Sequence, residues 1–216
     1  AEAEGLADRV RFEALDYRAL DRDFDRIVSV GMFEHVGVGH YRQFFETVAR
    51  RLRPDGVALI HAIGRFEGAG ATSPWIDRYI FPGGQVPAPS VLRQRAGEVG
   101  LRWREDAWFG RSYARTLATW HRNFDAAWPE IAALGFDRRF QRMWQYYLSY
   151  TEGGFRCGHA DVGQIVLATK LPDHFRRALA AARERGTALH AVEDEMTPGV
   201  THAEIGAYLL GIWGLP

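Results

Sequence analysis

The chain has 216 residues, with 27 basic and 27 acidic side chains and a formal net charge of zero. This balance argues against a protein that binds nucleic acid through bulk attraction to phosphates, so no nucleic-acid partner is expected. A local basic patch stays open, with Arg138, Arg139 and Arg142 as candidates. The only cysteine, Cys157, excludes an internal disulfide and a cysteine-rich zinc site, and we expect no bound metal.

The start of the sequence is acidic and lacks the apolar stretch of a signal peptide, and no apolar run is long enough to cross a membrane. We therefore expect a cytoplasmic protein whose contact with a membrane is peripheral. The chain has no initiator Met, and its first residues are typical of the end of a helix that stops at Gly5. We interpret it as a fragment whose upstream part is missing.

The next segments predict a strand, a helix and a second strand. A short strand candidate at 9–12 comes first, and the mostly apolar residues 24–30 predict a strand buried on both faces of a parallel sheet. The apolar face and basic end of 40–53 favour a helix, which the turn signal Pro54-Asp55-Gly56 should end. A buried strand at 57–63 completes the pattern, which predicts a βαβ unit with parallel strands.

A segment rich in glycine, proline and aromatic residues follows at 64–90, and a loop of this length predicts a lid or a substrate wall. The remaining patterns predict, in chain order, a helix at 91–99, a strand at 101–109, helices at 112–134 and 137–150, the second broken by Gly153-Gly154, and a strand at 162–169. The composition then changes, so we place a domain boundary near residue 171, before a helical tail at 172–216.

Two polar residues lie just past the ends of the strands of the βαβ unit. Glu34 follows the first strand and His61 lies near the end of the second, at the edge where open α/β sheets bind ligands. A carboxylate and an imidazole there are candidates for acid/base chemistry. Each candidate also has a purely structural explanation. Glu34 could be an acid that is favoured at the start of a helix, His61 could be a core histidine, and Tyr113 could be a core aromatic residue.

Aromatic side chains are abundant, and some could line an acyl-chain groove or face a cation.

Several motifs together resemble those of cyclopropane-fatty-acyl-phospholipid synthases and the related mycolic acid cyclopropane synthases. They cover about residues 1–170 in order: DYR (16–18), FDRIVSVGMFEHVG (24–37), RLRPDGVALIHAIG (51–64), YIFPGG (79–84), SYARTLATWHRNF (112–124) and RMWQYYL (142–148). The resemblance implies an α/β fold, a Rossmann-like class I methyltransferase sheet of seven mostly parallel strands with helices on both faces. Residues 1–171 would form its C-terminal part, with about strands 3 to 7.

The resemblance implies S-adenosylmethionine-dependent methyl transfer to the cis double bond of phospholipid acyl chains, which gives a cyclopropane ring. The enzyme would act at the inner face of the membrane, and in the family a bicarbonate ion is thought to take the proton lost as the ring closes. Matching positions imply that this ion is held by Glu34, His61, the backbone of Ile63, and Tyr113. Asp16 and Tyr17 match a loop that touches the adenine. Three questions stay open: whether the protein forms a homodimer, which acyl chain it uses, and whether the product carries a ring or a methyl branch.

The sequence departs from this family in two ways. It contains no Gly-x-Gly-x-x-Gly loop to hold a cofactor, so we expect the chain to be inactive on its own. Residues 200–216, VTHAEIGAYLLGIWGLP, resemble part of an HDOD domain, a regulatory relative of HD phosphohydrolases. Two alternatives to a cyclopropane synthase therefore stay open: a non-catalytic fragment or fusion that acts through this tail, and a related methyltransferase with a different substrate.

Overall fold

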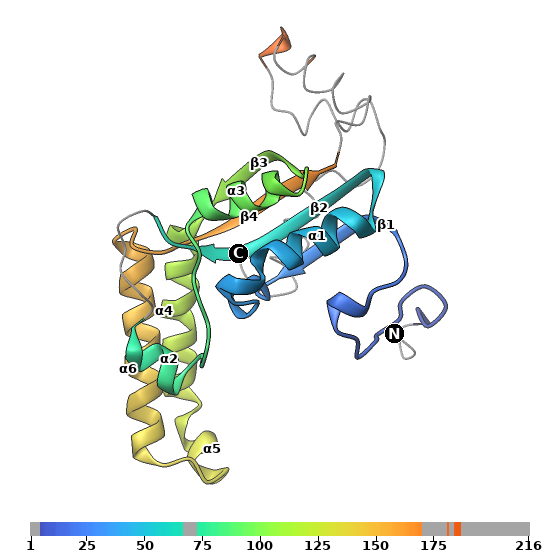
Figure 1. The fold of residues 1–216 in the computed structure, drawn as a ribbon. Helices are drawn as coiled ribbons and strands as arrows, with labels where there is room; N and C mark the ends of the chain where they lie inside the picture. The colour runs from blue at the N-terminus through green and yellow to red at the C-terminus, as the bar shows by residue number, and fades with distance from the viewer. Residues whose placement is uncertain (1–4, 67–72, 170–180, 182–183, 187–216) are drawn as a thin grey trace.

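The structure, a computed structural model, describes residues 5–66, 73–169, 181 and 184–186. A mixed sheet carries helices α1 (Tyr41–Arg51) and α3 (Pro89–Glu98) on one face, while α4 (Gly110–Ala126) and α6 (Arg138–Arg156) form a long pair that extends from its end (Figure 1). The predicted HDOD-like stretch and most of the predicted helical tail lie outside the described residues.

The predicted βαβ unit is confirmed. Strands β1 (Phe24–Val30) and β2 (Leu52–Gly64) are parallel neighbours joined by α1, and Val30 pairs with His61. The expected turn residues 54–56 lie in an irregular start of β2, where the pairing register shifts. Burial of β1 on both faces is wrong, because Val28 is 45% exposed and no described element covers it.

The rest of the sheet is antiparallel. Strand β4 (Asp161–Ala168) inserts between β2 and β3 (Arg102–Trp108), which gives the order β1-β2-β4-β3. The strand predicted at 9–12 is absent, because these exposed residues have no neighbouring strand edge with which to exchange hydrogen bonds. The described part of the sheet therefore has four strands, and only one of its three pairings is parallel.

Three helix predictions need correction. The segment predicted as one helix at 112–134 is divided into α4 and α5 (Trp128–Ala133), because Pro129 occupies the first turn of α5. Gly153 and Gly154 do not break α6, which continues to Arg156 because the buried Phe155 anchors its last turn. The predicted loop at 64–90 contains a short helix, α2 (Pro74–Tyr79).

Two apolar clusters hold these layers together. The first joins the sheet to α1 and α3 and includes Phe33, Phe44, Phe45, Ala58, Ile60, Ala62, Leu92 and Ile165. The second joins the sheet end to α4 and α6 and includes Leu117, Leu148, Phe155 and Val162, with Ile63 packed against it. Because neighbouring residues of a strand face opposite sides, Ala62 and Ile63 show that helices pack on both faces of the sheet at this end.

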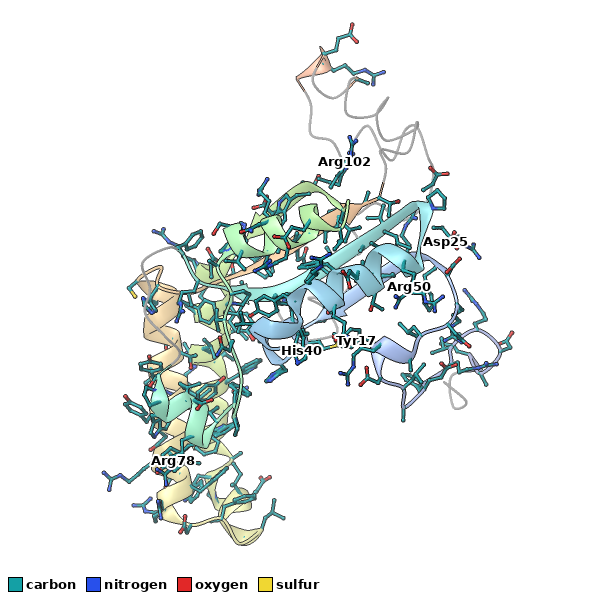
Figure 2. All side chains as sticks on the ribbon, in the orientation of Figure 1. Tyr17, Asp25, His40, Arg50, Arg78 and Arg102 are labelled. Atoms are coloured by element: carbon teal, nitrogen blue, oxygen red, sulfur yellow. The ribbon has the colours of Figure 1, made fainter. Side chains whose placement is uncertain are left out.

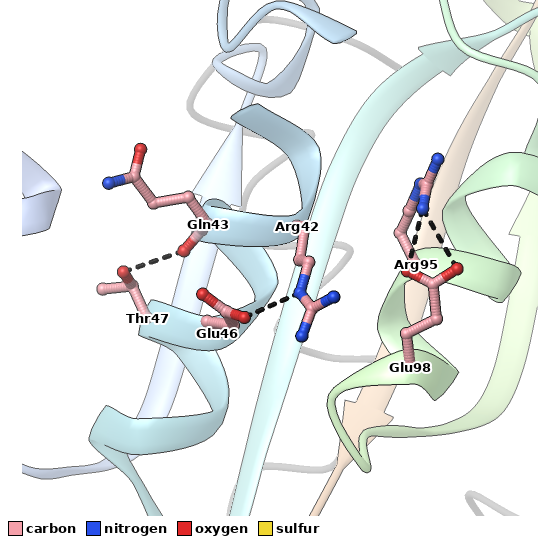
Figure 3. A network of polar contacts seen from close by, with 6 residues as sticks. All are labelled: Arg42, Gln43, Glu46, Thr47, Arg95 and Glu98. Carbon is pink, nitrogen blue, oxygen red and sulfur yellow. Dashed lines mark hydrogen bonds and ion pairs between the residues drawn. The ribbon is translucent and has the colours of Figure 1, made fainter. Parts of the chain in front are cut away.

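Ion pairs on the helices add little to this packing. Arg42 contacts Glu46 at 2.8 Å on α1, and Arg95 contacts Glu98 at 2.9 Å on α3 (Figure 3). All four side chains are partly open to solvent, where such a pair contributes about 0–1 kcal/mol. The apolar clusters therefore account for most of the stability.

A tryptophan packed on two glycines gives a test of this packing. A Cβ added at Gly163 would lie 2.6 Å from the ring of Trp108, and one at Gly64 would lie 2.7 Å from it. We expect Gly163→Ala to lower the free energy of unfolding by about 1–3 kcal/mol, because the ring has to move. Urea unfolding measures the change. Gly153→Ala is the matched control, since its Cβ meets no atom within 4 Å, and an equal loss in both variants would contradict the close packing.

Candidate active site

The end of β1 sets the position of Glu34. Gly31 follows the strand with φ of 58°, a left-handed conformation that favours glycine, and its N–H donates to the His61 carbonyl at 3.0 Å. The chain then enters a 3-10 turn, η3 (Phe33–His35), whose Phe33 is fully buried and packs against Tyr41, Phe44 and Phe45. This aromatic anchor fixes the turn, so the neighbouring Glu34 is placed beside the end of β2.

Glu34 is buried, with 8% of its surface exposed. One carboxyl oxygen, Oε1, accepts the backbone N–H of Ile63 at 2.6 Å, while Oε2 is buried and has no hydrogen-bond partner among the described residues. Burial raises the pKa of Glu34, and the N–H groups of Ile63 and of Glu34 itself partly oppose this. The backbone of Ile63 was expected to hold a bound ion, and in the structure its N–H donates to Glu34 instead.

His61 has a similar unsatisfied atom. Its Nδ1 is buried and has no hydrogen-bond partner within the described part of the chain. Burial lowers the pKa of His61, so the neutral imidazole is favoured near pH 7. The ring also contacts Phe109 edge-on, with centroids 5.9 Å apart.

Tyr113 comes from the first turns of α4. Its ring packs on Phe155 at 4.9 Å and on Trp120 at 6.1 Å. Burial, together with the smaller effect of the charges that Tyr147 and Glu34 can carry, raises the pKa of Tyr113 to about 12. The phenol is therefore a protonated O–H donor at neutral pH.

A cavity of about 340 Å³ brings these residues together. Glu34, His61, Ile63 and Tyr113 all line it, as four of the predicted site residues. Apolar and aromatic side chains dominate the rest of the wall, which includes Val30, Ile76, Phe81, Val86, Leu117, Trp120, Tyr147, Phe155 and Val162. Residues of the predicted wall segment 64–90 thus do line the cavity.

The other two predicted residues lie elsewhere. Asp16 caps a 3-10 turn, η2 (Tyr17–Ala19), and its carboxylate accepts hydrogen bonds from the Arg18 backbone and guanidinium. These bonds, led by those from the guanidinium, hold the pKa of Asp16 at about 2. Tyr17 packs edge-on against Phe44, with ring centroids 5.5 Å apart, and is labelled in Figure 2. Neither residue lines the cavity.

Sequence reasoning missed Tyr147 and Thr151 as site residues. Both line the cavity from α6, and the Thr151 hydroxyl donates to the Tyr147 carbonyl. Burial raises the pKa of Tyr147. The sequence placed Tyr147 on an apolar helix face, which is equally typical of core. A signal was nevertheless present in the sequence. Tyr113 on α4 and Tyr147 on α6 each lie on the apolar face of their helix, where a polar hydroxyl is unusual for a pure core position.

These features define a class of protein. An α/β sheet with helices on both faces and a cavity at the carboxyl ends of two parallel strands is the Rossmann-like fold of class I methyltransferases. A solved mycolic acid cyclopropane synthase in complex with S-adenosylhomocysteine and CTAB aligns with a TM-score of 0.66 and 26% identity, over 76% of this chain and 64% of that one.

The family follows from the sequence comparisons. The family model for mycolic acid cyclopropane synthetase matches residues 1–165, so the chain belongs to this family. It is 42% identical over 165 residues to the cyclopropane-fatty-acyl-phospholipid synthase of Escherichia coli, and 38% identical over 175 residues to the tuberculostearic acid methyltransferase of Mycobacterium tuberculosis. These alignments cover 76% and 79% of the chain but only 42% and 41% of the two relatives.

A second family model, for the HDOD domain, matches residues 159–216. This match begins well before the predicted HDOD-like stretch at 200–216 and overlaps the first match at 159–165. In the structure, Asp161–Ala168 is β4, which lies between two other strands of the sheet. The start of the HDOD match is therefore an integral part of the methyltransferase sheet.

Proposed function

We propose that the chain supplies the acyl-chain cavity and the proton-accepting end of an S-adenosylmethionine-dependent enzyme. This enzyme would methylate the cis double bond of a phospholipid acyl chain and give a cyclopropane ring. The observation that carries the proposal is a mostly apolar cavity with unsatisfied polar atoms of Glu34 and His61 in its wall. An acyl chain offers few hydrogen-bonding groups, so an apolar wall suits it, and the few polar groups mark where chemistry takes place.

The apolar wall would protect the reaction from water. Addition of a methyl group to an alkene leaves positive charge on the neighbouring carbon, which water would trap. Phe81, Trp120 and Tyr147 all line the cavity, and aromatic faces stabilise a nearby cation by about 0.5–2 kcal/mol. Positioning of the double bond by this wall is the main requirement, because the alkene is a weak nucleophile.

The polar end fits a small hydrogen-bonding anion such as bicarbonate. Glu34 Oε2 can accept the O–H of the ion, or donate when protonated, and Tyr113 can donate its phenolic O–H. Neutral His61 can donate from Nδ1 in the matching tautomer. We propose that these three residues hold the ion, and that the proton lost on ring closure is accepted at this end of the cavity.

We further infer that the site for the methyl donor is incomplete in this chain. When bound, S-adenosylmethionine supplies an electrophilic methyl group. Asp16 and Tyr17 stay candidates for the adenine contact, but they lie outside the cavity, and the sequence contains no Gly-x-Gly-x-x-Gly loop. Catalysis by the 216 residues alone is therefore not expected.

A chimeric enzyme tests the proposed function. The 165 matched residues of the E. coli synthase would be replaced by those of this chain, and the chimera would be expressed in an E. coli strain that lacks its own synthase. We expect cyclopropane fatty acids in the lipids, measured by gas chromatography and mass spectrometry. An unchanged fatty-acid profile, with the chimera folded by circular dichroism, would contradict the proposal. A methyl-branched product would instead favour the chemistry named for the mycobacterial methyltransferase.

A further inference from the structure

Helix α6 presents a stripe of arginine and tyrosine side chains. Arg139, Arg142, Tyr146 and Tyr150 are spaced by three, four and four residues, which places them on one side of the helix. All four are exposed, Tyr146 by 54% and Tyr150 by 45%. Large aromatic side chains that gather on a surface mark a contact site rather than a core.

Helix α2 extends this stripe. Trp75 packs edge-on against Tyr146 with ring centroids 4.7 Å apart, and it also contacts Tyr79, which is 45% exposed. The Arg78 guanidinium lies over the Tyr79 ring at 5.4 Å, and Arg78 is labelled in Figure 2. We call this surface the aromatic–arginine face; it consists of Trp75, Arg78, Tyr79, Arg139, Arg142, Tyr146 and Tyr150.

The positive charge of this face is not neutralised. Within the described part of the chain, Arg139 and Arg142 form no ion pair or hydrogen bond with an acidic side chain. Asp77, the acid on α2, accepts a hydrogen bond from the Gly83 backbone. The face thus combines exposed aromatic rings with unpaired guanidinium groups. It is complementary to a surface that has anionic groups on its outside and an apolar layer beneath them.

The same two helices also line the cavity. Ile76 follows Trp75 on α2, and Tyr147 follows Tyr146 on α6, yet both Ile76 and Tyr147 line the cavity wall. Phe81, just after α2, is 42% exposed and contacts Tyr147, with ring centroids 5.9 Å apart. The face and the cavity therefore lie on different sides of α2 and α6, about 100° apart around each helix.

We propose that the aromatic–arginine face docks on an anionic phospholipid surface, so that an acyl chain passes between α2 and α6 into the cavity. Tyrosine and tryptophan favour the boundary between headgroups and hydrocarbon, since one end of each ring system is apolar and the other polar. Arginines favour lipid phosphates. The proposal rests on the proposed function, and it adds the surface through which that function meets its substrate.

Vesicle binding tests the charge of the face. The full chain would be sedimented with vesicles of phosphatidylglycerol and phosphatidylcholine, and with vesicles of phosphatidylcholine alone. We expect the double variant Arg139→Gln/Arg142→Gln to weaken binding to the anionic vesicles about 30-fold. The matched control is Arg50→Gln/Arg102→Gln, which makes the same change of charge at exposed positions of α1 and β3. Both residues are labelled in Figure 2, and this variant should bind as the wild type does.

A second variant tests the aromatic part. Tyr146→Ser/Tyr150→Ser should weaken binding to both kinds of vesicle roughly tenfold, because ring insertion does not need lipid charge. Both side chains are exposed, so circular dichroism should show an unchanged fold. Unchanged vesicle binding by either face variant, or no vesicle binding by the wild type, would overturn the proposal. So would a wild-type dimer in analytical ultracentrifugation that the tyrosine variant converts to a monomer, since the face would then bind a second copy.

This experiment separates the docking surface from the proposed function. Sedimentation with vesicles requires neither a methyl donor nor turnover. A chimera that makes cyclopropane lipids while the face variants bind normally would contradict only the docking surface. Vesicle binding that depends on the face, together with a chimera that makes no methylated lipid, would contradict only the proposed function.

Discussion

We expect Glu34→Gln to lower the rate of cyclopropane formation by the chimeric synthase about 10²- to 10⁴-fold. The amide keeps the shape of the side chain and can still accept the Ile63 N–H through its oxygen. It replaces the buried Oε2, which has no partner, with an NH₂ group that can neither accept a hydrogen bond nor give up a proton. The site would therefore lose its ability to hold and orient the proton acceptor, while the acyl-chain wall stays intact.

The measurement is kcat and KM of the purified chimera with lipid vesicles and S-adenosylmethionine. The loss should fall on kcat rather than on KM, because the apolar wall that binds the chain does not change. Glu130→Gln is the matched control, since Glu130 is an exposed carboxylate on α5. If Glu34→Gln turned over at the unmutated rate, the role assigned to Glu34 would be wrong.

The βαβ unit could be predicted because its determinants are local. The apolar run of β1, the apolar face of α1 and the apolar run of β2 follow one another with short connections, so only one arrangement buries all three. The same reasoning failed at residues 9–12, which have strand-like composition. A strand there requires the edge of a neighbouring strand for hydrogen bonding, and the local sequence does not indicate whether such an edge is present.

Local signals were also overruled by packing in α6. Gly153 and Gly154 are poor helix formers, and the sequence alone favours a stop at that point. Burial of Phe155 against Tyr113 and its neighbours offsets the weak propensity, and this contact joins residues 42 positions apart in the chain (155 − 113). Antiparallel pairing of β4 with β2 and β3 is likewise a long-range outcome that periodicity does not encode.

The candidate site was predictable in part. Position at the ends of adjacent parallel strands was enough to single out Glu34 and His61, whereas Tyr113 and Ile63 came only from resemblance to a family. The structure places all four around one cavity. Tyr147 could not be told from a core aromatic, because its helix face is apolar in either case. The docking of α2 and its following loop next to α6, which turns that face into a cavity wall, is a tertiary contact.

We expect Glu34→Gln also to stabilise the fold, increasingly as the pH rises. Burial raises the pKa of Glu34 in the folded state above its ordinary value of 4.5. A raised carboxyl pKa means that the folded state holds its proton more tightly than the unfolded state, so stability is full below pH 4.5 and falls as the pH rises through the folded pKa. Glutamine never ionises and avoids this loss. At pH 8 the variant should be more stable by about 1–3 kcal/mol, because an unsatisfied buried carboxylate costs more than the unsatisfied neutral amide that replaces it.

Thermal unfolding of the 216-residue chain, followed by circular dichroism from pH 4 to pH 8, measures this difference. The melting temperatures of variant and wild type should converge at the acid end and separate by roughly 2–10 °C at the alkaline end. His61 is common to both chains, so its own titration cancels, and degassed buffer keeps bicarbonate from stabilising the wild type. Glu130→Gln, on an exposed carboxylate, should show no such divergence. A constant gap between Glu34→Gln and wild type at every pH would show that the Glu34 carboxyl has the same pKa in the folded and unfolded states. A proton-accepting site built on the burial of this carboxyl would then lose its electrostatic basis.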